Sequence, residues 1–257
     1  MAVTLEGGCC VSDMREGAPV VNGTLRIWNQ IGKANGAQAI SLRVIEFAPG
    51  LSPGIRNGDS DEILYVLGEE NGALEITIRI DDYEHPIGGD TGIYIRPRQT
   101  FAIDNPNANP VVVISSRCPD TAATPEFVAA VAACSPPSDS EPSPIVQLRN
   151  RAPQSTADRW YRVLVDGEVG SRQVTQFVGS IPPGRAPDHF HTYEEVLFIL
   201  NGEGRMWAGE TNTPIGVGSC IYLPKRQVHC VENTGKGALR LLGVFYPAGS
   251  PSVRYEA

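Results

Sequence analysis

The sequence predicts an all-β fold built from two similar halves. Gly (27) and Pro (21) make up nearly a fifth of the 257 residues, against about 12% in an average protein, which indicates many turns and therefore many short strands. Runs rich in β-branched and aromatic residues end at these turns, as strands do. The pattern of the first half also recurs in the second, which indicates an internal repeat.

The clearest strand candidates occur as matching pairs. Residues 41–47 and 172–178 have strand composition, and each runs into a turn that contains Pro and Gly. Residues 62–67 and 195–200 are nearly continuous apolar runs, each followed by a glycine. Short apolar runs bounded in this way are more often buried strands than helices.

The repeat itself is visible when Glu62 is aligned with Glu195. The pattern Glu-aliphatic-Leu-aromatic-aliphatic-Leu then matches across six positions. Farther along, residues 93–105 and 221–233 share five identical positions of thirteen. Two similar all-β halves predict two related small barrels or sandwiches, packed together like the two copies of a dimer.

A segment of different composition separates the halves. Residues 126–134 are rich in Ala and predict a short helix with Thr124 as its cap. Residues 135–144 are rich in Pro and Ser and predict a stiff linker. The domains predicted from the sequence are residues 1–118, the linker with its short helix at 119–144, and residues 145–257.

Charge and composition exclude several classes of protein. The net charge is −8 and the sequence pI is about 5.1, whereas binding to nucleic acid usually needs a basic face. No run of apolar residues is long enough to span a membrane, and the first residues do not resemble a secretory signal. The six cysteines form no CxxC pair, so we expect free thiols in a cytoplasmic protein without nucleic-acid or membrane partners.

Three of the four histidines lie in the second half, at a spacing that suits metal binding. His189 and His191 are two residues apart, so on a strand they project from one face. The same alternation places Glu195, and not Glu194, on that face. His229 follows a candidate strand and a turn containing Pro, which could return it beside the first pair.

This residue set predicts one divalent transition metal ion. Three imidazoles and a carboxylate suit Fe, Mn, Ni, Cu or Zn, and an octahedral ion would keep two positions open for water or substrate, as a catalytic site requires. His85 stands beside Glu84 and Pro86, and we expect it to be exposed. The metal ligands predicted from the sequence are His189, His191, Glu195 and His229.

Two segments of the second half resemble the motifs of the cupin superfamily. Residues 184–202 resemble the first motif, with a Gly before His-x-His, then Glu195, six residues and a Gly. Residues 218–233 resemble the second, with Gly, five residues, Pro, and later His, three residues and Asn. The Gly-to-His spacing of the first motif is one residue short, and Arg226 replaces the usual Gly in the second. The resemblance implies jelly-roll β-barrels with the metal inside, and with the repeat it implies a bicupin.

The first half departs from this pattern. On the same alignment Arg56, Gly58 and Phe101 occupy the positions of the three histidines, and only Glu62 remains. The metal motif is therefore intact only in the second half. The first barrel either completes the fold, with Arg56 paired to Glu62 in place of a metal, or binds an anion through Arg56.

The resemblance leaves the reaction open, because cupins include dioxygenases, decarboxylases, isomerases, lyases, hydrolases and non-enzymatic binders. We favour a dioxygenase-like oxidoreductase acting on a small polar molecule. A metal-dependent isomerase, lyase or hydrolase of a sugar or amino-acid derivative is nearly as well supported, and a ligand-binding or storage protein is a further alternative. No residue beyond the four ligands receives a catalytic role, and both a monomer and a homodimer are consistent with the sequence. Four further residues flank the motif, and the sequence does not show toward which face of the strand they point: Arg185, Tyr193, Arg205 and Tyr222.

Overall fold

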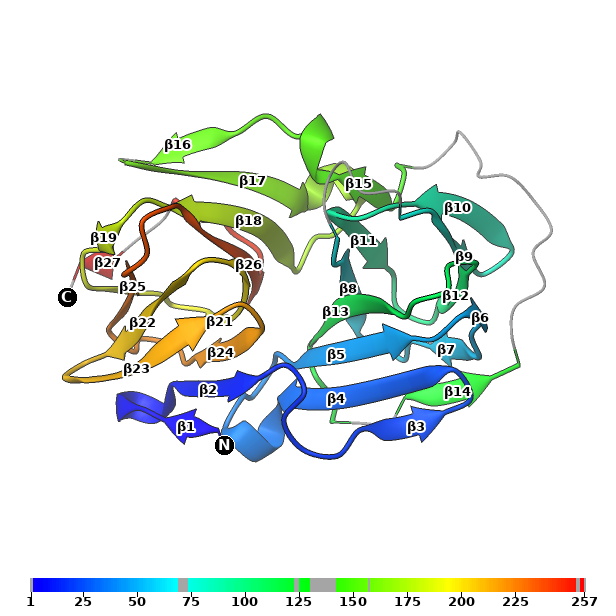
Figure 1. Cartoon of the computed structure of the whole chain (residues 1–257), viewed down its shortest axis with the longest axis horizontal. Coiled ribbons are helices and arrows are strands. Elements are labelled where there is room, and N and C mark those ends of the chain that lie inside the picture. The colour runs from blue at the N-terminus through cyan, green and yellow to red at the C-terminus, as the bar shows by residue number, and fades with distance from the viewer. Residues whose placement is uncertain are drawn as a thin grey trace.

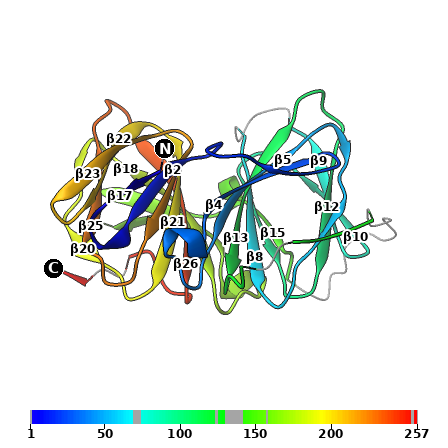
Figure 2. The ribbon, with the colours of Figure 1, turned by 90° about the horizontal axis from the view of Figure 1, so that it is seen from below.

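Strands grouped into two β-barrels make up nearly all of the regular secondary structure of the protein. The structure, a computed structural model, describes residues 2–68, 74–122, 125–129, 142–156, 158–252 and 255–256. The barrels lie side by side (Figures 1 and 2), and each consists of two sheets. We call the sheet that faces the other barrel the inner sheet, and its counterpart the outer sheet. No helix in the described part is long and apolar enough to cross a membrane. The short 3-10 helices are η1 (Glu6–Gly8), η2 (Lys33–Asn35), η3 (Leu148–Asn150) and η4 (Gly167–Val169).

The N-terminal barrel has a seven-stranded inner sheet and a six-stranded outer sheet. All strand pairs within them are antiparallel. The inner sheet contains β3 (Val20–Asn22), β4 (Leu25–Ile31), β5 (Leu42–Phe47), β8 (Asp61–Val66), β11 (Thr91–Ile95), β13 (Val111–Cys118) and β15 (Ile145–Gln147). The outer sheet contains β6 (Gly50–Leu51), β7 (Gly54–Arg56), β9 (Ile76–Ile80), β10 (Tyr83–Ile87), β12 (Thr100–Asn105) and β14 (Glu126–Val128).

The C-terminal barrel repeats this plan with an eight-stranded inner sheet and a six-stranded outer sheet. The inner sheet contains β1 (Val3–Thr4), β2 (Cys10–Asp13), β16 (Gln154–Thr156), β17 (Arg159–Val165), β18 (Thr175–Ile181), β21 (Glu194–Asn201), β24 (Ser219–Leu223) and β26 (Leu239–Tyr246). The outer sheet contains β19 (Gly184–Arg185), β20 (His189–Phe190), β22 (Glu203–Ala208), β23 (Thr211–Gly216), β25 (His229–Asn233) and β27 (Tyr255–Glu256). The prediction of an all-β chain with two tandem jelly-roll barrels is confirmed.

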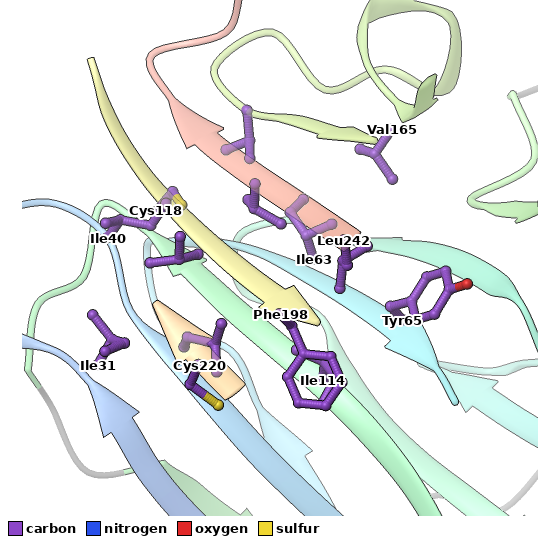
Figure 3. Packing of buried hydrophobic residues seen from close by; sticks show 14 of the residues in the cluster. Ile31, Ile40, Ile63, Tyr65, Ile114, Cys118, Val165, Phe198, Cys220 and Leu242 are labelled. Atoms are coloured by element: carbon purple, nitrogen blue, oxygen red, sulfur yellow. The ribbon is translucent and has the colours of Figure 1, made fainter. Parts of the chain in front are cut away.

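The hydrophobic core consists of three apolar layers. One layer fills each barrel, and the third packs the two inner sheets against each other. Along β8, Leu64 belongs to the layer inside the barrel, whereas Ile63 and Tyr65 belong to the layer between the barrels. Figure 3 shows Ile63 and Tyr65 in the same layer as Phe198 and Leu242 of the other barrel. Because both faces of β8 and β21 are buried, each of these two inner strands contains a nearly continuous apolar run after its acidic first residues.

The inner sheets exchange strands across the chain. β2, near the N-terminus, pairs with β24 of the C-terminal barrel, and β15 pairs with β11 of the N-terminal barrel. In Figure 1, β1 and β2 lie along the C-terminal barrel. The boundaries predicted after residues 118 and 144 follow the order of the chain, whereas the sheets extend across them.

The helix predicted over residues 126–134 is wrong in its first turn. Glu126–Val128 form β14, which pairs with β7 in the outer sheet of the N-terminal barrel. The Ala-rich composition favours a helix, but the neighbouring strand edge offers backbone hydrogen bonds that a three-residue helical turn lacks. The cap Thr124, most of the remaining predicted helix and much of the Pro/Ser segment lie outside the described residues.

Candidate metal centre

β20 and the start of β25 bring two histidines together. His189 lies directly opposite His229 in the antiparallel register, a position at which side chains stand roughly 5 Å apart. His191 follows one residue after β20, and its carbonyl accepts a hydrogen bond from the amide of Arg226 (2.7 Å) in the turn before His229. The three ring centroids are 4.7 to 5.0 Å apart, and one ligand atom from each ring lies within 4.8 Å of the others.

The turn that carries Arg226 has the same geometry in both barrels. Arg226 has a φ of 63°, and Arg98, its counterpart in the N-terminal barrel, has a φ of 70°. Both lie in the left-handed region that favours glycine. This explains why a glycine is usual here, and it shows that the atypical arginine does not change the path of the chain toward His229.

Backbone carbonyls orient two of the three imidazoles. His189 Nδ1 lies 3.0 Å from the carbonyl oxygen of Pro187, and His229 Nδ1 lies 2.8 Å from that of Gln227. A carbonyl oxygen can only accept, so each Nδ1 carries the proton and each Nε2 keeps its lone pair. Burial, with a smaller contribution from the neighbouring His189, lowers the pKa of His229 to about 4. His229 is therefore neutral at pH 7, the form in which an imidazole binds a metal.

Glu195 joins this group through His191. Its Oε2 lies 3.2 Å from His191 Nε2, and it is 5% exposed. Burial raises the pKa of the Glu195 carboxyl to about 8, as expected for a carboxylate in an apolar environment without a cationic partner. The ring of Tyr193 stacks on His191, with centroids 4.7 Å apart and an angle of 10° between the rings.

Glu194 points the other way, into the contact between the barrels. Its carboxylate accepts hydrogen bonds from the amides of Gln38 (2.8 Å) and Ala39 (2.7 Å). The hydroxyl of Tyr222 also donates to Glu194. The two consecutive glutamates thus lie on opposite faces of β21, with Glu195 inside the barrel and Glu194 outside it.

The histidines and Glu195 line a pocket of about 110 Å³ inside the C-terminal barrel. Its walls are mainly apolar and aromatic. Arg159, on β17, also lines the pocket, and its side chain is 14% exposed. Sequence reasoning missed Arg159 because it lies 30 residues before His189, and the pairing of β17 with β18 brings it to the site. The apolar and aromatic lining includes Trp160, Tyr161, Phe177, Ile181, Tyr193, Leu197, Leu223, Val231 and Leu241.

Three of the four flanking residues noted in the sequence do not line this pocket. Arg185 lies over the ring of Trp207 (4.2 Å to the centroid) on the surface. Arg205 is exposed and contacts Asn212. Tyr222 contributes to the layer between the barrels. Of the four, only Tyr193 reaches the pocket.

The N-terminal barrel corrects two expectations. Arg56 does not pair with Glu62: it is half exposed and forms an ion pair with Glu126 (3.1 Å), because the short strand β7 directs it toward β14. Glu62 is instead buried in an ion pair with Arg43. His85 is not exposed, since it is only 8% accessible in β10, opposite the buried Ile78.

Comparisons with known proteins match both the segment that carries these residues and the two-barrel fold. The model of the Cupin domain family matches residues 177–245, which contain all four predicted ligands. A solved structure of oxalate decarboxylase superposes on 93% of this chain and 77% of that chain, with a TM-score of 0.74 at 11% sequence identity. A structure that concerns the Mn(II) centres of Bacillus subtilis oxalate decarboxylase covers 93% of this chain and 78% of that one, with a TM-score of 0.74 at 12% identity. Residues 177–245 thus belong to the cupin superfamily.

Two curated relatives share part of this bicupin. Auxin-binding protein 1 of Arabidopsis thaliana is 32% identical over 113 residues, which cover 38% of this chain and 57% of that protein. An uncharacterised protein of Methanocaldococcus jannaschii is 35% identical over 57 residues, which cover 22% of this chain and 46% of that protein. The chain therefore spans only about half the length of each relative. At 11–12% identity the likeness to oxalate decarboxylase shows the shared two-barrel fold.

Proposed function

We propose that the C-terminal barrel of this bicupin is a metal-dependent active site, in which His189, His191, His229 and Glu195 hold one divalent ion. The observation that carries the proposal is the convergence of three imidazoles at one wall of a pocket, two of them oriented by backbone carbonyls. Ligands oriented in this way are typical of metal sites and uncommon among histidines that merely fill a core.

The donor set fits such an ion. Three neutral nitrogens and one carboxylate oxygen suit Fe, Mn, Ni, Cu or Zn, and leave positions of an octahedral ion open. When bound, the ion supplies Lewis-acid activation of a substrate oxygen or a redox couple for chemistry with dioxygen. The stack of Tyr193 on His191 restricts that imidazole to one orientation, and the apolar walls exclude water from the reacting atoms.

The pocket also supports a class of substrate. Its volume of about 110 Å³ admits only a small molecule or the reacting end of a larger one. Arg159 is the one cationic side chain other than the histidines among the described residues that line it. Its Nε pairs with the exposed Asp158 (3.1 Å), and its terminal N–H groups would donate to an acidic or other oxygen-bearing group of the substrate. We therefore propose a small oxygen-bearing substrate with an apolar body, held between Arg159 and the metal.

A dioxygenase-like oxidation is the reaction that the pocket favours. Isomerases, lyases and hydrolases usually position an acid and a base at the substrate. Among the described residues that line this pocket, Glu195 is the only carboxylate, there is no lysine, and Glu195 contacts His191. Chemistry that depends on the metal and on dioxygen needs no further acid or base from the walls.

Metal analysis of the purified full-length chain, followed by oxygen-uptake assays, tests the proposal. The assay panel consists of catechols, flavonoids and 2-oxo acids. His191→Ala should abolish metal binding, whereas His85→Gln, which changes the histidine of the other barrel, should leave it intact. A wild-type protein that binds no divalent metal would contradict the proposed metal-dependent active site. Bound metal without oxygen uptake would favour isomerase, lyase or hydrolase chemistry, and bound metal without turnover of any kind would favour a binding or storage protein.

A further inference from the structure

Gly179 forms part of the wall of the pocket inside the C-terminal barrel. It is the middle residue of the inward face of β18, because Phe177 and Ile181, two residues to either side, both belong to the apolar layer inside this barrel. Tyr161 on β17 and Leu241 on β26 lie directly opposite it. A wall that presents a phenylalanine, then no side chain, then an isoleucine has open space at Gly179.

The backbone at this position does not require glycine. The φ of Gly179 lies outside the left-handed region. A Cβ added here would lie 3.4 Å from Leu241 Cδ1 and 3.5 Å from Phe177 Cε2, which is ordinary van der Waals contact. Glycine within a strand is less favourable than alanine, and it often marks a point where a ligand approaches the backbone closely.

Gly243, on the adjacent strand β26, shows what a structural glycine looks like in this barrel. It lies opposite Phe177, and a Cβ at Gly243 would come 2.3 Å from an atom of the Phe177 ring. Gly243 therefore makes room for a side chain of the protein. Gly179 instead leaves room that belongs to the pocket.

The N-terminal barrel fills the equivalent position with a side chain. Ile45 lies opposite Val113 of β13, as Gly179 lies opposite Leu241 of β26. Ile45 is fully buried and belongs to the apolar layer inside its barrel. The barrel that carries the histidines is thus open at the point where the barrel without them is packed.

A row of aromatic rings joins this open space to the metal centre. Tyr193 stacks on His191, and Phe245 stacks on Tyr193 with ring centroids 4.4 Å apart. The ring of Phe177 lies next, with its centroid 6.0 Å from that of Phe245. Gly179 follows two residues after Phe177 on the same face of β18. The space at Gly179 therefore continues the apolar wall that begins at the histidines.

We propose that Gly179 is a specificity-determining residue, because the space over its Cα receives the apolar body of a ligand whose oxygen atoms bind the metal. The inference rests on the proposed metal-dependent active site and adds which ligands that site selects. These ligands have an oxygen-bearing head at the ion and an apolar body long enough to pass Phe177. A side chain at position 179 would shorten the longest body that fits, without contacting the ion.

Hydroxamates of increasing chain length test this proposal in calorimetric titrations of the metal-loaded, full-length chain. Acetohydroxamate, butyrohydroxamate and hexanohydroxamate present the same two oxygens to the ion and differ only in their apolar body. In the wild type we expect hexanohydroxamate to bind at least tenfold more tightly than acetohydroxamate, because each methylene group removed from water adds roughly threefold to the affinity. In Gly179→Val this gain should fall below threefold, whereas metal content and the affinity for acetohydroxamate should stay within twofold.

Gly237→Val is the matched control. Gly237 is exposed in the bend before β26, and a Cβ there meets no atom within 4 Å, so this variant should keep the whole gain with chain length. If Gly179→Val does not fold, Gly179→Ala takes its place and should reduce the gain at least twofold.

Thermal unfolding of the metal-free proteins tests the role of the glycine separately. Gly179→Ala should melt at or above the wild-type temperature, and Gly243→Ala should melt below it, because its new methyl group collides with Phe177. A fall in Gly179→Ala as large as in Gly243→Ala would overturn the proposal. Bound metal with an unchanged gain in folded Gly179→Val, or with an equal loss of all three hydroxamates, would overturn the role of Gly179 and leave the metal site standing. A wild type that binds no metal, or no hydroxamate, would refute both.

Discussion

The two barrels place a glutamate at the same point and surround it differently. Glu62 lies opposite Arg117 on the neighbouring inner strand, and Glu195 lies opposite Phe245. One strand farther on, the matching positions hold Arg43 and Phe177. The N-terminal barrel therefore has two arginines where the C-terminal barrel has two aromatic rings.

This difference shows two ways of keeping a carboxylate inside an apolar barrel. In the N-terminal barrel a guanidinium pairs with Glu62, and the histidine positions hold an outward arginine, a glycine and a phenylalanine. In the C-terminal barrel the carboxylate of Glu195 contacts His191, and a metal ion would supply the positive charge. An arginine beside Glu195 would compete with the ion for the carboxylate oxygens. The aromatic residues at these positions therefore keep the carboxylate of Glu195 available to the ion.

The largest effect is expected on metal affinity, when the metal site is changed to resemble the equivalent position of the N-terminal barrel. His229→Phe introduces the residue found at the equivalent Phe101, and we expect a loss of metal affinity of at least about 1,000-fold, or about 4 kcal/mol, because an inward nitrogen ligand is replaced by an apolar ring. Metal content after dialysis and competition with a chelator measure it. In the wild type, removal of the metal should also lower the melting temperature, a shift that His229→Phe should no longer show.

The reverse change is the matched control. Phe101→His adds one imidazole to the N-terminal barrel, where Arg43 already occupies the carboxylate of Glu62. We expect no second metal ion per chain. A second ion bound by this variant would contradict the view that the arginine, and not only the missing histidines, excludes metal from this barrel.

Breaking the buried ion pair should have the next largest effect. Arg43→Met removes the guanidinium that pairs with Glu62 and leaves its carboxylate with the hydrogen bond from Ser115, which should lower the free energy of unfolding by about 3 kcal/mol. The double variant Arg43→Met/Glu62→Gln removes the stranded charge and should recover most of this loss. Urea unfolding of the three proteins measures it, and a double variant no more stable than the single one would argue against an ion pair as the cause.

The fold and the histidine cluster were predictable because both leave regular marks in the sequence. The repeat and the apolar runs indicate paired barrels, and the motif spacing brings His189, His191 and His229 together. A signal for Arg43 was also present, since it lies two residues before Ile45 and so shares its face of β5, yet Arg43 lies outside the motif. The register that brings it to Glu62 depends on pairing across three strands.

The predictions that were wrong failed where distant segments decide the outcome. Glu84 and Pro86 suggest a surface around His85, but pairing with β9 turns that side chain inward. Arg56 turns outward because β14 lies beside it, and no residue near Arg56 in the sequence indicates that this distant strand pairs there. The exchange of β2 and β15 between the barrels likewise depends on pairing over long separations in the chain.

The consecutive glutamates of β21 offer a test within one barrel. Glu194→Gln replaces a carboxylate that accepts hydrogen bonds from the amides of Gln38 and Ala39. We expect the free energy of unfolding to fall by about 2 kcal/mol, because the new amide group directs N–H donors toward other donors. Metal content should not change, since Glu194 faces the other barrel. Loss of metal in a folded Glu194→Gln protein would mean that the faces of β21 are assigned the wrong way round.

The smallest effect is expected at Arg56, where the sequence and the structure disagree. Its ion pair with Glu126 is half exposed, and such pairs contribute roughly 0–1 kcal/mol. Arg56→Ala should therefore lower the free energy of unfolding by no more than about 1 kcal/mol. Urea unfolding of the wild type and of Arg56→Ala measures this difference. A loss of more than about 1 kcal/mol in the folded variant would contradict the assignment of Arg56 to a solvent-screened surface pair with Glu126.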